Sequence, residues 1–469
     1  MIFTPKFLIK KDGAFRFGGE ITATAHTCLA PSVFAELWQG FTFRTSVLKV
    51  NTADSLVFSV GNAAVPSLDG HAYAINVEKT GFCVAADNEK DLILGFMTLL
   101  DRIRAVDTED GMALELDACE IKDSPAIQNR MIHYCVFPET ELYEIQRFFR
   151  VCAALKFTHV VIEFWGMLKY DCLAELSWPC AFTKDQVRPI ITEARELGLE
   201  IIPMFTPWGH AAAGRVRHGK HVVLDQNPAL QTYFTEDGWC WDISKDKVRA
   251  LLRKIRHELC ELCGEGGYFH IGCDEAYNFE FSRENMDFLC DFINEISAEM
   301  KAQGRRAIAW GDMFLFRHPH YNPKNLYVCN APTPEVETYM LERLSRDVVI
   351  ADWQYDSPEA PVETSAVFVK AGFDTLICPW DRSESKLKSC TATARDQGLF
   401  GVMHTTWHTL SAGATYLPIV AVECFGNNGD YKKGNSRTHT AAVFRKVFFV
   451  NGDYAKAGWS KIQVNDVCT

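Results

Sequence analysis

The chain has 469 residues, of which 48% are hydrophobic and 23% are charged, and its formal net charge is −12. This composition is that of a globular protein long enough for two domains, or for one large barrel with an addition. The negative charge argues against nucleic acid or an anionic membrane surface as a partner.

The 17 cysteines are scattered along the chain without regular spacing, and their number is odd. This pattern predicts mostly free, buried thiols in a reducing compartment. The first residues lack an uninterrupted apolar stretch with a small-residue cleavage site, and no run approaches the ~20 apolar residues of a membrane span. We therefore expect a cytoplasmic protein, provided that no leader precedes this sequence.

Residues 1–122 are predicted to form a small α+β domain. Asn88 is a plausible N-cap for a helix with Asp91 in its first turn and an apolar face at helical spacing. The candidate strands are 45–50, 55–60, 72–77 and 81–85.

Residues 123–469 alternate between strands and helices, which predicts a (β/α)8 TIM barrel. Thr183 and Gln186 form a capping box at the start of one helix, and Ser244 is predicted to cap another. Residues 416–454 have helical patterning that would close the barrel, whereas a doubly wound open sheet is the alternative fold. The predicted barrel strands are 130–136, 158–164, 199–205, the one beginning at 268, 307–310, 348–353, 375–379 and 402–407.

The fourth of these strands ends in two adjacent carboxylates, Asp274 and Glu275. Carboxylates are unsuited to the middle of a buried strand, so we expect them at its exposed carboxyl end, where barrels place their active sites. Neighbouring carboxylates push their pKa values apart, so that one can hold a proton near neutral pH. A solvated acidic turn is the alternative for a bare Asp-Glu pair.

The full pattern around this pair, His270-Ile271-Gly272-Cys273-Asp274-Glu275-Ala276-Tyr277, resembles the signature of family 20 glycoside hydrolases, the β-N-acetylhexosaminidases. It is most similar to their hexosaminidase D branch. The resemblance implies a retaining enzyme without a cofactor or metal, which removes terminal β-linked GlcNAc or GalNAc from a carbohydrate or glycoconjugate. A homodimer is one option for its assembly.

The resemblance implies substrate-assisted catalysis, in which the sugar's 2-acetamido oxygen attacks the anomeric carbon and forms an oxazolinium ion. Glu275 would be the general acid and then the base, and Asp274 would accept the acetamide N–H. Adjacent carboxylates on one strand suit this route, because a two-carboxylate retaining enzyme needs its carboxyl groups on both sides of the scissile bond.

The resemblance also implies three supporting residues at strand ends. His210 would contact Glu275, although Trp208 interrupts the Pro-Gly-His that the family has at this point. Glu163 would hold the tautomer of His210 or bind a sugar hydroxyl directly. His270 would pair with a neighbouring carboxylate or backbone group.

By the same resemblance, tryptophans at strand ends would wall a sugar pocket, because the C–H face of a pyranose stacks on an indole. The candidates for this wall are Trp310, Trp353 and Trp407. Tyr355 would donate to the acetamide oxygen, and Asp381 would bind a hydroxyl. Asp312, in a Trp-x-Asp shared with the family, is expected to be structural.

Recognition of the sugar hydroxyls departs from the main family branch. That branch has an arginine where this chain has 135–138, and an acid where this chain has His408. The chain shares an Arg-x-x-His pattern, Arg130 and His133, with hexosaminidase D, and both residues are candidates for substrate binding.

Two alternatives of a different class remain open at this stage. One is a noncatalytic sugar-binding barrel. The other is a metal-dependent barrel hydrolase that uses His210, Asp274, Glu275 and His404. A lone Cys-x-x-Cys at 260–263 has no second half, so a structural zinc site there is not favoured.

Overall fold

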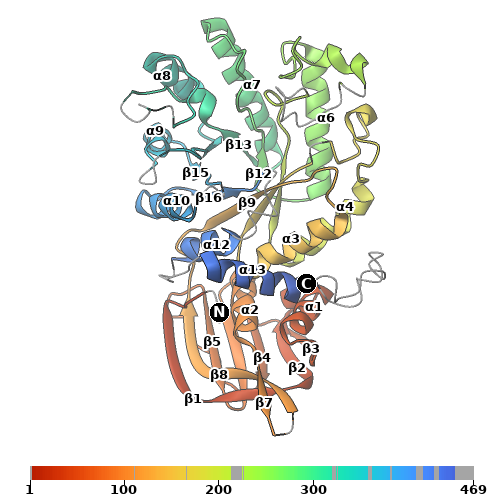
Figure 1. Ribbon diagram of the computed structural model, residues 1–469, viewed down its shortest axis with the longest axis vertical. Coiled ribbons are helices and arrows are strands. Elements are labelled where there is room, and N and C mark those ends of the chain that lie inside the picture. The colour runs from red at the N-terminus through yellow and green to blue at the C-terminus, as the bar shows by residue number, and fades with distance from the viewer. Residues whose placement is uncertain are drawn as a thin grey trace.

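The computed structural model describes residues 3–109, 111–164, 166–212, 224, 227–319, 324, 326–357, 362–380, 383–407, 416–426 and 433–448. These residues form an open sheet near the N-terminus and a closed eight-stranded barrel, drawn below and above in Figure 1. Within the described ranges, no helix combines the length and the apolar character that crossing a membrane requires. The sixteen cysteines in these ranges are all free, as predicted.

The open sheet has the strand order β1-β8-β5-β6-β4-β2-β3, with β7 paired to β8. Only β2 and β3 pair in parallel. The strands are β1 (Phe7–Phe17), β2 (Gly19–His26), β3 (Ser46–Ala53), β4 (Val57–Gly61), β5 (Tyr73–Glu78), β6 (Gly81–Ala86), β7 (Arg104–Thr108) and β8 (Gly111–Asp123). The short helix η1 (Thr27–Leu29) and the helices α1 (Ser32–Phe41) and α2 (Glu89–Arg102) complete this domain.

The helix α2 begins as the sequence predicted. The side chain of Asn88 accepts a hydrogen bond from the Asp91 N–H at 2.9 Å, and this bond satisfies one of the free donors of the first turn. The aromatic rings of Phe96 on α2 and Phe58 on β4 meet edge to face, with centroids 5.0 Å apart. The helix therefore buries its apolar face against the open sheet.

All eight predicted barrel strands are confirmed, and the sheet closes in the order β9 to β16, which excludes the open-sheet alternative. The barrel strands are β9 (Asn129–Cys135), β10 (His159–Glu163), β11 (Glu200–Met204), β12 (Tyr268–His270), β13 (Arg306–Trp310), β14 (Val349–Asp352), β15 (Thr375–Ile377) and β16 (Gly401–Thr405). The outer helices are α3 (Leu142–Ala154), α4 (Lys184–Glu196), α6 (Asp246–Cys263), α7 (Arg283–Ala302), α8 (Pro334–Arg343), α9 (Thr364–Lys370) and α10 (Glu384–Asp396). Three short helices, η2 (Ala174–Leu176), η3 (Pro228–Tyr233) and η4 (Asp312–Phe314), lie in the loops.

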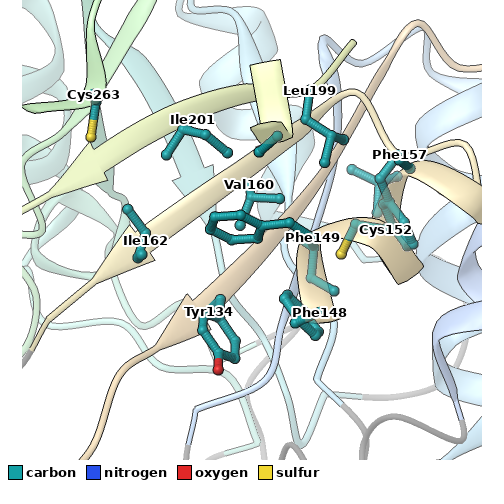
Figure 2. Close-up of a cluster of buried hydrophobic side chains, with 14 of the residues drawn as sticks. Tyr134, Phe148, Phe149, Cys152, Phe157, Val160, Ile162, Leu199, Ile201 and Cys263 are labelled. Carbon is teal, nitrogen blue, oxygen red and sulfur yellow. The ribbon is translucent and has the colours of Figure 1, made fainter. Parts of the chain in front are cut away.

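Side chains alternate between the two faces of the barrel strands, as the pleat requires. On β10, Val161 belongs to the cluster that fills the barrel, whereas Val160 and Ile162 belong to the layer under the helices. Figure 2 shows part of this outer layer, where Tyr134 of β9 stacks on Phe148 of α3 with ring centroids 4.3 Å apart. The barrel interior is therefore a packed core, and a ligand can bind the barrel strands only at their ends.

One expectation about the helices is wrong. Ser244 is not the N-cap of its helix, because α6 begins at Asp246 after Lys245, and the Ser244 hydroxyl instead donates to Asp242. The C-terminal helices α12 (Leu417–Phe425) and α13 (Lys433–Phe448) do more than close the barrel.

The helix α13 packs on α1, α3 and α12, between the barrel and the open-sheet domain (Figure 1). Gly40 of α1 allows this close approach, because a Cβ there would lie 1.8 Å from the Lys446 carbonyl oxygen. The two domains are thus joined by a shared helical layer rather than by a linker alone.

Candidate active site

The turn that follows β12 carries the two carboxylates in a constrained backbone. Cys273 and Glu275 have φ angles of +74° and +49°, a region that costs a residue with a side chain about 1–3 kcal/mol. Gly272 has φ +60°, and a Cβ at this position would lie 2.6 Å from the Thr206 hydroxyl oxygen. The Gly272 N–H donates to Nδ1 of His270 at 3.0 Å, so His270 supports the turn through the backbone, as predicted.

The imidazole of His210 lies between the two carboxylates. Its Nε2 is 2.9 Å from Oε2 of Glu275 and 3.4 Å from Oδ2 of Asp274. The Glu275 side chain is 21% exposed and that of Asp274 only 5%. The ring of His210 also packs against Trp239, with centroids 4.4 Å apart. The sequence prediction that His210 contacts Glu275 is therefore matched by the geometry.

The buried carboxylate of Asp312 holds the backbone and one wall of this site. Its Oδ2 accepts the Glu275 N–H at 3.0 Å and the Asn330 amide at 2.9 Å, and its Oδ1 accepts the Trp353 indole N–H at 3.0 Å. Burial, reinforced by the charges of Asp274 and Glu275, raises the pKa of Asp312 well above its ordinary value. Asp312 is thus a positioning residue that links the pair to the aromatic wall.

Asp274 carries a hydrogen-bond acceptor that the described residues leave unused. Its Oδ1 is buried and has no hydrogen-bond partner, while its Oδ2 faces His210. A buried carboxylate oxygen without a donor is costly, so its presence at a strand end is consistent with a donor that arrives with a ligand.

Three of the predicted aromatic residues come together with Tyr355. Trp407 donates its indole N–H to the Tyr355 hydroxyl at 2.8 Å, and its ring lies 5.9 Å from that of Trp310. Trp353 packs on Tyr355 with ring centroids 5.0 Å apart. Burial raises the pKa of Tyr355 well above its ordinary value, so this hydroxyl keeps its proton at neutral pH.

Arg130 lies away from this group, and the prediction that it binds substrate is wrong. It is the second residue of β9, at the amino end of the barrel, and its guanidinium donates to the carbonyl oxygens of Ile127, Gln128 and Lys156. Burial lowers its pKa to about 10. Arg130 holds the start of the barrel rather than a sugar.

Glu163 and His133 face the barrel interior but form a different pair from the one predicted. Oε2 of Glu163 lies 3.4 Å from Nε2 of His133, whereas Nδ1 of His210 has no hydrogen-bond partner among the described residues. The prediction that Glu163 holds the tautomer of His210 is therefore wrong. His133 packs against Trp407, with ring centroids 4.6 Å apart.

The metal-hydrolase alternative needs His404 beside His210, Asp274 and Glu275, and the structure does not bring His404 to them. On β16, Met403 belongs to the cluster inside the barrel, so the next residue, His404, faces the helices. The two groups of potential metal ligands in the described ranges contain neither Asp274 nor Glu275. Asp381 lies outside the described residues.

Two contacts of Glu275 escaped the sequence interpretation. Trp239 donates its indole N–H to the Glu275 carbonyl oxygen at 2.7 Å, and Tyr277 hydrogen-bonds the Glu275 side chain. Trp239 belongs to a long loop after β11, where no strand-end pattern marks it. Tyr277 was visible as part of the motif, and its position two residues after Glu275 was the signal for a contact.

The fold and this geometry define a (β/α)8-barrel protein with a carboxylate and imidazole centre at the carboxyl ends of its strands. Residues 165–383 match the family model of the glycosyl hydrolase family 20 catalytic domain.

The chain is 23% identical over 291 residues to a beta-hexosaminidase of Porphyromonas gingivalis strain W83, an alignment that covers 54% of this chain and 37% of that protein. It thus spans little more than a third of the length of this curated relative.

Solved structures share the fold at low sequence identity. A Bacteroides fragilis β-N-acetylhexosaminidase superimposes with a TM-score of 0.65 at 16% identity, covering 96% of this chain and 95% of its own. A family 20 exo-β-N-acetylglucosaminidase of Vibrio harveyi gives 0.66 at 15% identity, covering 95% and 77%. A Flavobacterium johnsoniae chitobiase gives 0.68 at 15% identity, covering 99% and 73%.

Proposed function

We propose that the protein is a retaining exo-β-N-acetylhexosaminidase that removes terminal β-linked GlcNAc or GalNAc by substrate-assisted catalysis. The observation that supports this proposal is that two adjacent carboxylates differ in their exposure and in their hydrogen-bond partners. Glu275 is partly exposed and hydrogen-bonded to His210, whereas Asp274 is buried with Oδ1 left without a donor. An acid that exchanges protons needs access, and a residue that orients an amide needs a free acceptor.

In the first step, Glu275 gives its proton to the glycosidic oxygen while the 2-acetamido oxygen of the sugar attacks the anomeric carbon. The acetamide N–H donates to Oδ1 of Asp274, whose charge also stabilises the oxazolinium ion that forms. In the second step, Glu275 takes a proton from a water molecule that attacks the same carbon. Two displacements at one carbon restore the β configuration.

In this proposal the aromatic residues bind the acetamide group and the sugar ring. Trp310, Trp353 and Trp407 supply the apolar surfaces on which a pyranose and its methyl group pack. The Tyr355 hydroxyl accepts the Trp407 indole N–H, and in this proposal it donates its own proton to the acetamide oxygen. Two similar solved structures are named as an exo-β-N-acetylglucosaminidase and a β-N-acetylhexosaminidase, and these names support this substrate class.

The decisive experiment compares substrates that differ only at C2. A chromogenic β-N-acetylglucosaminide or β-N-acetylgalactosaminide should be hydrolysed, whereas the matching glucoside and galactoside should be almost inert. NMR of the first product formed should show the β anomer. A thiazoline mimic of the cyclic intermediate should bind much more tightly than substrate, as ligands that resemble the transition state do.

The matched variant is Asp274→Asn, which keeps the size of the side chain and removes its charge. We expect kcat to fall by about 10²–10³, the range for loss of one preorganised electrostatic partner of a transition state, with an unchanged thermal unfolding curve. Inversion at the anomeric carbon, or a trapped covalent glycosyl-enzyme, would overturn the proposal. Binding of the sugars without any hydrolysis would favour the noncatalytic alternative.

A further inference from the structure

Three side chains of different chemistry converge inside the mouth of the barrel. His133 and Cys135 are two residues apart on β9 and therefore face the same side. Glu163 ends β10 directly beside them, in register with Cys135. All three residues are at most 3% exposed. The strand register thus fixes an imidazole, a thiol and a carboxylate around one point.

The distances among their polar atoms are consistent and long. Nε2 of His133 is 3.4 Å from Oε2 of Glu163, and Sγ of Cys135 is 3.7 Å from that nitrogen and 3.9 Å from that oxygen. A well-formed N–H···O bond is shorter, at about 2.9–3.0 Å. The distance between His133 and Glu163 is therefore long for such a bond, whereas the two sulfur distances are compatible with weak hydrogen bonds of a thiol.

The same distances fit the edges of a tetrahedron of metal ligands. Zinc binds imidazole nitrogen and carboxylate oxygen at about 2.0–2.2 Å and thiolate sulfur at about 2.3 Å. With tetrahedral angles, these bond lengths separate neighbouring ligand atoms by about 3.3–3.7 Å. The three observed distances lie within a few tenths of an ångström of this range, so that a small contraction would complete the ligand set.

We propose that His133, Cys135 and Glu163 bind one divalent metal ion of the zinc class. The mixed set of sulfur, nitrogen and oxygen suits this class better than magnesium or calcium, which prefer oxygen alone. Three protein ligands leave the fourth position of a tetrahedral ion for water or another small oxygen ligand. The proposal replaces the sequence-based expectation of no metal.

The position of the site ties it to the aromatic residues. The His133 ring has its centroid 4.6 Å from that of Trp407 and 6.3 Å from that of Trp310. The ion would therefore lie beneath two of the tryptophans and fix β9 to β10 at their carboxyl ends. It goes beyond the proposed function, in which no step uses a metal, and either proposal can fail without the other.

The second group of potential ligands, His26, Cys28 and Glu89, is a weaker candidate and a useful control. It lies in the open-sheet domain, and its Glu89 is exposed. Nδ1 of His26 already accepts the Cys28 N–H at 3.3 Å, which occupies the lone pair that a metal would need. Substitution of Cys135 or of Cys28 therefore shows which of the two groups binds a metal, because each group contains one of these cysteines.

The test is a titration of the full chain with Co²⁺ after chelator treatment and dialysis. A cobalt thiolate gives a charge-transfer absorption in the near ultraviolet, and we expect it to saturate at one equivalent. Cys135→Ser should abolish this absorption, and Glu163→Gln should weaken the affinity at least tenfold. Cys28→Ser and Cys378→Ser should leave the titration unchanged, since Cys378 is equally buried in the barrel but outside the proposed ligand set.

Thermal unfolding supplies a second measurement if Cys135→Ser folds poorly. Zn²⁺ should raise the Tm of the wild-type chain and of Cys28→Ser, because a ligand that binds only the folded state stabilises it, and the same concentration should raise the Tm of Glu163→Gln by less. The proposal is overturned if the wild-type chain shows no cobalt thiolate absorption. It is also overturned if the absorption is lost in Cys28→Ser and retained in Cys135→Ser.

Discussion

Nε2 of His210 lies 2.9 Å from Oε2 of Glu275 and 3.4 Å from Oδ2 of Asp274, so that one imidazole nitrogen faces two carboxylates. The imidazole is well placed to stabilise the negative charge that Glu275 gains when it gives up its proton. His210 therefore acts on the reaction through Glu275.

The first prediction concerns the variant His210→Phe, which keeps the ring that packs on Trp239 and removes its nitrogens. A hydrogen bond to a charged group contributes about 1.5–3 kcal/mol, so kcat should fall by about 10- to 150-fold. The control is His257→Phe on the exposed side of α6, which should be neutral. Unchanged kinetics in His210→Phe would show that the imidazole takes no part in the reaction.

The second prediction uses leaving groups to identify the general acid. Glu275→Gln should lower kcat by about 10²–10⁴ for substrates with poor leaving groups, the usual contribution of a positioned proton donor. The loss should be much smaller for activated aryl leaving groups, which depart with little protonation. Steady-state rates across a series of aryl N-acetylglucosaminides measure how kcat depends on the pKa of the leaving group. An equal loss across the series would assign the proton to another residue.

The third prediction tests the support beneath the pair. In Asp312→Asn, one carboxylate oxygen becomes an NH₂ group, which must face the N–H of either Glu275 or Trp353. An unsatisfied buried donor costs about 1–3 kcal/mol, so the Tm should fall, and kcat should fall with it because the Glu275 backbone shifts. Asp291→Asn, on the exposed side of α7, is the matched control. A fully active and stable Asp312→Asn would show that the carboxylate does not position the site.

The barrel could be predicted because its strands are short apolar runs at regular spacing. The carboxylate pair could be predicted because it follows directly on one of these apolar strands. The strand β1 was missed because it is largely exposed and carries several charges, so no apolar run marks it. The contact of Trp239 with Glu275 joins a loop to a strand end, and such tertiary contacts leave no local pattern.

Two errors at the site have different physical causes. Arg130 and His133 are three residues apart on one strand and must face opposite sides of it, so they cannot both line a pocket inside the barrel. Glu163 meets His133 rather than His210 because β10 pairs in register with β9, with Glu163 beside Cys135. The alternation of side chains along β9 could be predicted from the sequence, whereas the register between β9 and β10 could not.

The last prediction concerns Lys156, which is buried where the two domains meet. Its Nζ donates to the Tyr73 hydroxyl at 3.0 Å and lies 4.1 Å and 4.4 Å from the ring centroids of Phe3 and Phe425. Burial lowers its pKa from 10.5 to about 7, although the charges of Asp123 and Asp101 oppose this shift.

Because the folded-state pKa of Lys156 lies below the unfolded value, the folded chain binds fewer protons than the unfolded chain between about pH 7 and 10.5. The lysine therefore costs most stability below pH 7, and the cost shrinks by about 1.4 kcal/mol per pH unit as the pH rises through this window. Lys156→Met should stabilise the protein more at pH 6 than at pH 9, as measured by urea unfolding at both values. Lys254→Met, an exposed lysine of α6, should show no such difference. An equal effect of Lys156→Met at both pH values would mean that Lys156 stays charged in the folded chain.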